Sequence, residues 1–570
     1  MSLAIPTPQA INTRHKAPNN KEETVKIKRL LPGEYAKAVA GYSTLGTGAG
    51  QNHVNLGRFL TNTPDSPRIH SQSRQGDDGF VTLYDLGNVP VMQPSSPPHH
   101  PSSSDGEGDE TSDEKRHQAL VPEKFQDADS FYRFNLEKPP QSCIIFLRGF
   151  MTAQWINNIG ARYFVDPEFF CRHLDFSPVN DTASNFSIPA LPSSSGHLIE
   201  LPIITIGKRR DGTSTDNINE MRSLGASALA NHYHQVSKLG ASGLKLGDSM
   251  IREYHVFDEN HFAIEQRVSI CMQQPKKEND ANQTFTLLAW LDAGTEFPPQ
   301  TFNPWATYSQ GPQYLPVIRH KPMVALKCHL FTNDGPDSNI RQVQSLASLP
   351  FGYGRWLRPS LMAKDPFYTI IEILDFAASS QIQFLNLIDA KLCAYTSGPT
   401  SKEYESLGHL KYIKSILNSH LQKTKRVLDS IKNSQLSAWP RDSSNTHQRT
   451  ANAAHNVEQD FQHILDRTVS LHTRVSEAIS VLMSSMSISE SQRAIIQAQR
   501  VGKLTFLAFI FVPLSFTTSL FGMNVTQIEN GKLGIWVWFV VSVPIVAVVF
   551  ALYFVDVSKY WDELRVAINL

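Results

Sequence analysis

The residues best suited to chemistry form the triplet Gly522-Met523-Asn524, in a short polar segment between two long apolar runs. Glycine permits a tight backbone turn at the end of a helix, and the asparagine amide oxygen accepts hydrogen bonds. Neutral acceptors such as the Asn524 amide and nearby carbonyls suit an ion that keeps its water shell, because they accept hydrogen bonds from the coordinated water. One Asn524 cannot surround an ion, so this chemistry requires several copies of the chain around an axis.

The other polar residues offer little catalytic chemistry. The sequence has no G-x-x-x-x-G-K-[ST], no G-x-S-x-G and no H-E-x-x-H, and these motifs carry common phosphate-binding, nucleophilic and metal chemistries. His255, His261 and Glu265 are candidate metal ligands, but we read them as ordinary half-buried polar residues. We therefore predict that the protein is not an enzyme and that it has no cofactor apart from a transported ion.

Composition excludes further classes of function. Lys and Arg total 53, as do Asp and Glu, and this balance gives no support for nucleic-acid binding. The five cysteines form no Cys-x-x-Cys pair, so we predict reduced thiols in a cytosolic part. The N-terminal stretch has no apolar core of signal-peptide length, and we expect the apolar runs themselves to direct insertion.

The elements that must position the triplet are the two apolar runs, residues 504–521 and 534–555, which carry no charge. About 20 helical residues cross a ~30 Å hydrocarbon layer. We therefore predict a transmembrane hairpin with a loop over 522–533. Basic residues flank the hairpin on its two outer sides (Arg493, Arg500, Lys503, Lys559 and Arg565), and the loop has only Lys532. This asymmetry predicts a multi-pass protein with both termini cytosolic, including a short tail over 556–570.

With its upstream residues, the triplet resembles the CorA family of magnesium channels. Leu504-Thr505 and Ile510-Phe511-Val512-Pro513-Leu514 follow the family pattern that precedes Gly-Met-Asn. The resemblance implies a homopentamer in the lipid bilayer, with the first span lining the pore and the triplet forming an outer filter. It further implies that divalent cations pass along four pore-lining or gating positions: Ser515, Val512, Leu504 and Val501.

The chain before the hairpin divides into three predicted parts. Residues 1–125 are rich in Pro and Ser, which predicts a disordered tail. Residues 126–360 predict a cytosolic α/β domain, with a helix starting at Asp166-Pro167 and a long polar loop near 208–250. We expect five strands in this domain, at Cys143–Leu147, Leu198–Ile206, Tyr254–Phe257, Ala263–Met272 and Thr284–Leu291.

Residues 361–503 predict a helical region. Helices are expected after Asp365-Pro366 and over Tyr404–Leu436. An apolar seam with alternating spacings of four and three residues then indicates a stalk helix over about 451–503, as in a coiled coil. Its serine-rich part, 483–493, predicts either splayed helices or a wet vestibule. Three acidic residues of the stalk are candidates for regulatory Mg2+ sites between subunits (Asp460, Asp466 and Glu477). The predicted fold is thus an α+β cytosolic domain, a long stalk helix and two transmembrane helices.

Three functions stay open at this point. Inward passage of Mg2+ is the first, and the zinc-carrying branch of the same family is the second. The third is a non-conducting, membrane-anchored interaction protein, which is favoured by an outer loop with a single acidic residue, Glu529. Glu22, Glu23 and Glu34 argue against mitochondrial import, so we expect the plasma membrane.

Overall fold

The computed structural model divides the chain into two compact units. The N-terminal unit comprises Met1–Lys391 and Ile416–Leu471, and the C-terminal unit comprises Leu392–Ser415 and His472–Leu570. The structure describes most of both units, over residues 30–43, 50–61, 79–87, 120–136, 141–175, 191, 195–209, 217–237, 244–274, 284–295, 297, 304–305, 313–320, 345–397, 403–434, 439–440, 447–523 and 536–554.

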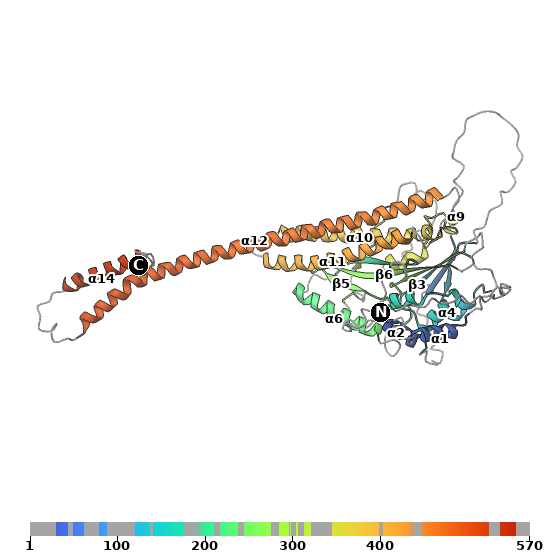
Figure 1. Ribbon diagram of the computed structural model, residues 1–570, viewed down its shortest axis with the longest axis horizontal. Helices are drawn as coiled ribbons and strands as arrows, with labels where there is room; N and C mark the ends of the chain where they lie inside the picture. Colours follow the sequence, from blue (N-terminus) through green and yellow to red (C-terminus); the bar gives the residue numbers. More distant parts are fainter. Residues whose placement is uncertain are drawn as a thin grey trace, which may run out of the picture. The chain divides into compact units, whose positions relative to one another are not determined.

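An eight-stranded mixed sheet forms the centre of the N-terminal unit (Figure 1). Its strands are β1 (Val81–Asp85), β2 (Glu123–Phe125), β3 (Cys143–Arg148), β4 (Leu198–Lys208), β5 (Glu253–Val256), β6 (His261–Gln273), β7 (Thr286–Leu291) and β8 (Gln313–Tyr314). The strand order is β2-β1-β3-β7-β6-β4-β8, with β5 paired to β6. Only β3 and β7 run parallel, and the long strand β6 pairs antiparallel with β4, β5 and β7.

Helices cover both faces of this sheet because its central strands are apolar on both sides. On β3, Ile145 and Leu147 join the core that α1, α2, α4 and α5 complete. The alternate residue Phe146 faces the other way and contacts Tyr353 at 4.7 Å between ring centroids. The first group of helices is α1 (Pro32–Ser43), α2 (Gly50–Thr61), α3 (Ala128–Arg133), α4 (Ala153–Tyr163) and α5 (Pro167–Leu174).

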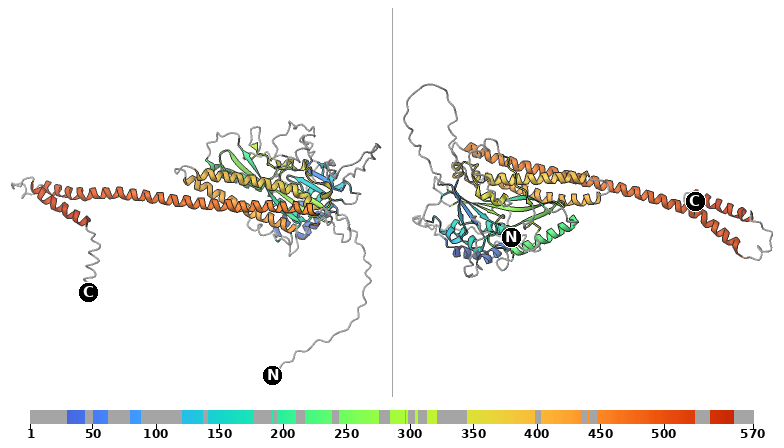
Figure 2. Two further views of the ribbon diagram at one scale, coloured as in Figure 1. Left: turned by 90° about the horizontal axis from the view of Figure 1, so that it is seen from above. Right: turned by 180° about the vertical axis from the view of Figure 1, so that it is seen from behind.

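The opposite face carries the helices that follow the sheet in the chain. These are α8 (Ser345–Ser348), η2 (Leu349–Phe351), α9 (Pro359–Met362), α10 (Pro366–Thr396) and α11 (Glu403–Asn433). Gln381 of α10 donates its amide to the Pro202 carbonyl of β4 at 3.2 Å. Figures 1 and 2 show α10 and α11 beside the first part of α12 (His447–Gly522). Arg467 of α12 donates to the Asn386 side chain of α10 at 2.6 Å.

The structure confirms many predicted elements. The five predicted strands correspond to β3–β7, and Asp166 caps α5 by accepting a hydrogen bond from the Glu168 amide at 3.0 Å. The predicted stalk and first span form one helix, α12, of 76 residues. A second apolar helix, α14 (Trp536–Phe554), corresponds to the predicted second span.

The structure differs from the predicted organisation of the chain in three places. Residues 1–125 are not wholly a disordered tail, because α1, α2 and β1 pack into the core, where their apolar residues are buried; the extreme Pro/Ser-rich stretch, 94–116, lies outside the described residues. The predicted loop over 208–250 contains helix α6 (Ile218–Ser237). The boundary at 360 does not separate two bodies, because α10 packs on the sheet within one unit.

A buried ion network lies at the end of β7. Asp292 accepts hydrogen bonds from Arg252 Nε at 2.7 Å, Arg252 Nη2 at 2.8 Å and the Arg267 amide at 2.6 Å. His173 Nε2 lies 3.1 Å from the same carboxylate. Burial alone would raise the pKa of Asp292, but Arg252 and His173 hold it well below its usual range. Burial lowers the pKa of His173 to about 4, and its other ring nitrogen, Nδ1, lies 2.8 Å from Ser269 Oγ.

A second cluster joins the sheet to α11. Glu253 and Glu265 are direct partners across β5 and β6, where like charges repel. Lys423 of α11 lies between them and donates to Glu253 at 2.6 Å and to Glu265 at 2.7 Å. Burial raises the pKa of Glu265, whereas His255 and Lys423 overcome burial and lower the pKa of Glu253 to about 2.

Candidate ion pathway

The end of α12, together with α14, forms the apolar part of the C-terminal unit. Within the described residues, α12 is the helix whose length and composition suffice to cross a membrane, and the apolar stretch of α14, Trp536–Ala551, is shorter. Most of their large apolar side chains are exposed in the single chain. Such a surface is typical of helices that face lipid or further copies of the same chain.

One face of α12 is covered by α14. The aromatic rings of Phe506 and Phe550 pack edge to face, with their centroids 5.5 Å apart. Further towards the end of α12, Ser542 Oγ donates a hydrogen bond to Thr517 Oγ1 at 3.0 Å. The less exposed residues of this part of α12 are Ile510, Pro513, Leu514, Thr517 and Phe521, and their spacing places them on one side of the helix.

The four predicted pore residues share the opposite side of α12. At about 100° per residue they fall within an arc of about 80°, and the centre of this arc lies about 180° from Thr517. All four are exposed, including Val501 at 54%, Leu504 at 68% and Val512 at 64%. Ser515 donates its hydroxyl to the Val512 carbonyl at 2.9 Å. The described structure therefore leaves this face of the helix open to other chains or to water.

The structure describes only the beginning of the predicted filter. Gly522 is the last residue of α12, and Met523 follows it with an exposed side chain. Asn524 and Glu529 lie outside the described residues. The chain therefore leaves the helix at the triplet, as the sequence predicts.

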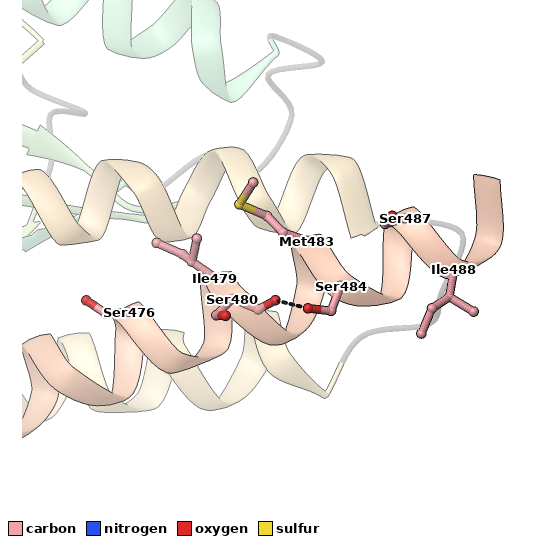
Figure 3. Close-up of a pocket in the computed structure, with 7 residues that line it drawn as sticks. All are labelled: Ser476, Ile479, Ser480, Met483, Ser484, Ser487 and Ile488. Carbon is pink, nitrogen blue, oxygen red and sulfur yellow. Dashed lines mark hydrogen bonds between the residues drawn. The ribbon is translucent and has the colours of Figure 1, made fainter. Parts of the chain in front are cut away.

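A groove lies along the serine-rich part of α12 (Figure 3). It encloses about 600 Å3, and successive turns of the helix line it with Ser476, Ile479, Ser480, Met483, Ser484, Ser487 and Ile488. Ser476 and Ser484 donate their hydroxyls to carbonyls one turn earlier, each at 2.9 Å. The buried seam of α12 ends at Val475, and later seam positions are partly or fully exposed. The close packing of α12 thus loosens where the serines begin.

Basic side chains follow the groove and precede the apolar part of α12. Arg493, Arg500 and Lys503 are all exposed. The sequence has no Asp or Glu between Glu490 and Glu529, so Arg500 and Lys503 have no acidic neighbour along the helix, whereas Arg493 has Glu490 three positions before it. This arrangement is typical of the cytosolic side of a membrane span.

The candidate regulatory carboxylates of the stalk do not gather into a metal site. Among the described residues, no group of three or more His, Cys, Asp or Glu side chains has the geometry to hold a metal ion. Burial and the neighbouring Asp375 raise the pKa of Asp460. Asp466 accepts a hydrogen bond from Gln462 at 2.9 Å, and Glu477 is exposed.

The candidate ligands of the sheet do not form a metal site either. Glu265 pairs with Lys423, His255 Nε2 lies 3.0 Å from Glu253, and His261 Nδ1 lies 3.0 Å from Asp258. Each of these side chains therefore has its own protein partner. His255 and His261 are half-buried, as interpreted from the sequence, whereas Glu265 is buried.

Sequence reasoning missed the polar contact between the two apolar helices. Thr517 and Ser542 look like isolated small hydroxyls in apolar runs, and neither belongs to the triplet or its upstream pattern. Their positions could have indicated a contact between helices, because a hydroxyl in an apolar span usually faces another helix. Only the paired arrangement of α12 and α14 shows that the two hydroxyls meet.

Comparison with known proteins finds a family match for the C-terminal part of the chain. Residues 357–558 match the model of the CorA-like Mg2+ transporter protein family. No curated protein matches the chain. Among solved structures, the CorA magnesium transporter from Methanocaldococcus jannaschii is similar at 11% sequence identity. That match covers 62% of this chain and 98% of the other chain, with a TM-score of 0.27.

Proposed function

Through residues 357–558 the chain is a member of the CorA-like Mg2+ transporter family, and we propose that it forms a membrane channel that passes Mg2+ into the cytosol. In this proposal several copies, most simply five, surround one pore. The last part of α12 lines the pore and α14 stands outside it as the second span. Both termini are cytosolic, and the plasma membrane is the proposed location.

The observation that carries this proposal is the division of α12 into two faces. Thr517 and its neighbours contact α14, whereas Val501, Leu504, Val512 and Ser515 share the open opposite face. A pore helix in a ring of subunits needs such an arrangement, because its inner face must stay free of its own second span. Apolar rings at Leu504 and Val512 would close the pore by dewetting, and a ring of Ser515 hydroxyls would contact hydrated ions.

The outer filter is assigned to the triplet. Gly522 ends the helix, and a ring of Asn524 amides would accept hydrogen bonds from the water shell of Mg2+. The membrane potential would drive the ion inward by about 4.6 kcal/mol per 100 mV, since each elementary charge contributes about 2.3 kcal/mol. No side chain needs to change its protonation state or form a covalent bond.

The first experiment measures Mg2+ uptake into liposomes that contain the purified protein, for wild type and Asn524→Ala. Uptake by wild type that collapses in the variant supports the channel and its filter. Lack of uptake by wild-type protein that is folded and oligomeric rules the channel out. Parallel uptake of Zn2+, Co2+ and Ni2+ separates a magnesium channel from the zinc-carrying alternative.

A second experiment tests the proposed pore face. A water-soluble cationic thiol reagent should block flux through Ser515→Cys. The matched control is Leu520→Cys, which is also exposed but lies about 140° round the helix from Ser515. Equal block of the two variants would contradict the assignment of the pore face.

A non-conducting, membrane-anchored interaction protein is the second candidate. The observation in its favour is the charge of the predicted outer loop, in which Lys532 offsets the single acid Glu529. Such a loop attracts few cations to the mouth of a pore. The absence of uptake in the first experiment would support this candidate, and the exposed surface of the N-terminal unit would then be the place to seek a binding partner.

A further inference from the structure

Thr517 and Ser542 stand apart from the other side chains of the two apolar helices. Over the described side chains of residues 501–523 and 536–551, these two are the buried ones, at 1% and 2% exposure. Ser542 Oγ donates to Thr517 Oγ1 at 3.0 Å, and Thr517 Oγ1 donates to the Leu514 carbonyl at 3.0 Å. The three groups form one chain of hydrogen bonds from α14 into the backbone of α12.

This chain of bonds lies where both helices are locally weakened. Pro513 in α12 and Pro544 in α14 lack the amide hydrogen that a helix interior requires. Thr517 lies four residues after Pro513, and Ser542 lies two residues before Pro544. A hydroxyl in hydrocarbon can bond only to another protein group, such as a carbonyl of its own helix or a side chain of a neighbouring helix. The Ser542 hydroxyl bonds to Thr517 of the other helix, so this bond joins the two helices within about one turn of each proline.

The predicted filter begins shortly after this level. Gly522 lies five residues beyond Thr517, or about 7.5 Å along the helix axis. This last part of α12 is separated from the rest of the helix by Pro513 and is attached to α14 through Thr517. Its position therefore depends on the hydrogen bond to Ser542 as well as on the continuity of α12.

We propose that Thr517 and Ser542 are positioning residues for the filter. They tie the end of the pore helix to the second span, and they set where the triplet lies in the ring of subunits. The inference rests on the proposed channel function, and it assigns to α14 the role of a fixed support for the filter. Neither residue faces the pore, so they act through Gly522 and the residues that follow it.

The functional test uses variants that remove or keep one hydroxyl in the full-length protein. Thr517→Val and Ser542→Ala delete the bond, Thr517→Ser keeps it, and Thr518→Val is the matched control. Thr518 is exposed, and its hydroxyl donates to the same Leu514 carbonyl at 2.7 Å, but it does not join the bond to α14. Mg2+ uptake into liposomes is measured with and without cobalt(III) hexaammine, an inert cation with the size of hexahydrated Mg2+.

If the filter is misplaced, it should bind cobalt(III) hexaammine less tightly. We expect Thr517→Val and Ser542→Ala to lower the affinity of the block by about tenfold, and the double variant to be no worse than either single variant. Thr517→Ser and Thr518→Val should stay within about twofold of wild type. Unchanged block in both deletion variants, or effects that multiply in the double variant, would overturn the proposal.

A second measurement tests the juxtaposition without relying on flux. In membranes treated with copper phenanthroline, Thr517→Cys with Ser542→Cys should form a disulfide that mass spectrometry finds between the two tryptic peptides. Thr518→Cys with Ser542→Cys should not. If wild type conducts Mg2+ but the Thr517→Cys, Ser542→Cys variant does not cross-link, the positioning role is wrong and the channel stands. If this variant cross-links but wild type does not conduct, both the channel and the positioning role are wrong.

Discussion

Replacing Asp292 by Asn should destabilise the N-terminal unit by about 3–5 kcal/mol, the range found when one partner of a buried ion pair is removed. The amide keeps the shape of the carboxylate but loses its charge. Arg252 then stays buried, with two of its nitrogens 2.7 and 2.8 Å from a neutral group. His173 also loses the carboxylate that faces its Nε2.

Urea titration of the full-length protein in detergent micelles would measure this loss. Tryptophan fluorescence is a suitable signal, because the Trp290 ring stacks on His173 with centroids 4.0 Å apart. For a slope of about 3 kcal/mol per M, the midpoint of unfolding should fall by about 1–2 M. Replacing both partners by apolar residues, as in Arg252→Met with Asp292→Leu, should recover much of the loss.

Glu458→Gln provides the control. Its ion pair with Lys432 spans 3.8 Å, and the two side chains are 30% and 43% exposed. An exposed pair of this kind contributes less than about 1 kcal/mol. If Asp292→Asn shifts the midpoint no more than this control does, the buried network is not a major source of stability and the reasoning is wrong.

Three further predictions concern the same unit. Burial lowers the pKa of three histidines to about 4, 4 and 3 (His173, His232 and His420). Between about pH 6.5 and 4 the unfolded chain therefore binds more protons than the folded chain. As the pH falls through this range, each histidine should lower the free energy of unfolding by up to about 1.4 kcal/mol per pH unit, and the raised pKa of Glu265 should oppose part of this loss. Urea midpoints at pH 7 and pH 5 test this prediction, and equal midpoints would contradict it. Gly207→Ala should lose about 1–3 kcal/mol in the same titration, because its Cβ would overlap the Phe262 ring. Lys423→Met should lower the free energy of unfolding by about 3 kcal/mol, because it leaves the carboxylates of Glu253 and Glu265 without a neutralising charge. Adding Glu265→Gln should restore part of this stability. If it restores none, charge is not the cause of the loss.

The two apolar helices and the central strands could be predicted because their signals are local. Uncharged runs of about 20 residues predict spans, and short apolar runs such as 143–147 predict buried strands. The predicted cap at Asp166 is likewise confirmed by a bond to a residue two positions away. Each of these features depends on neighbours in sequence.

The features that sequence reasoning missed depend on distant partners. The strand β1 pairs with β3, which lies about 60 residues later in the chain. The polar residues on both sides of β1 in the sequence made this strand hard to predict. Asp292 ends a strand, as expected from the sequence, but its burial follows from Arg252 and His173, which approach it from other elements. The Thr517–Ser542 bond likewise requires the pairing of two helices, which residue types alone do not specify.

The continuity of α12 also fixes an order of events during synthesis. The N-terminal unit is complete at Leu471, and the ribosome needs about 2–6 s to make the 32 residues from His472 to Lys503 that precede the first apolar run, at about 5–20 residues per second. The sheet that joins β1 to β7 therefore has time to fold before either apolar helix emerges. The targeting machinery receives these helices late, attached to a folded body that cannot be threaded through a narrow pore. In the proposed topology, the two apolar helices would then enter the bilayer only after the N-terminal unit has folded.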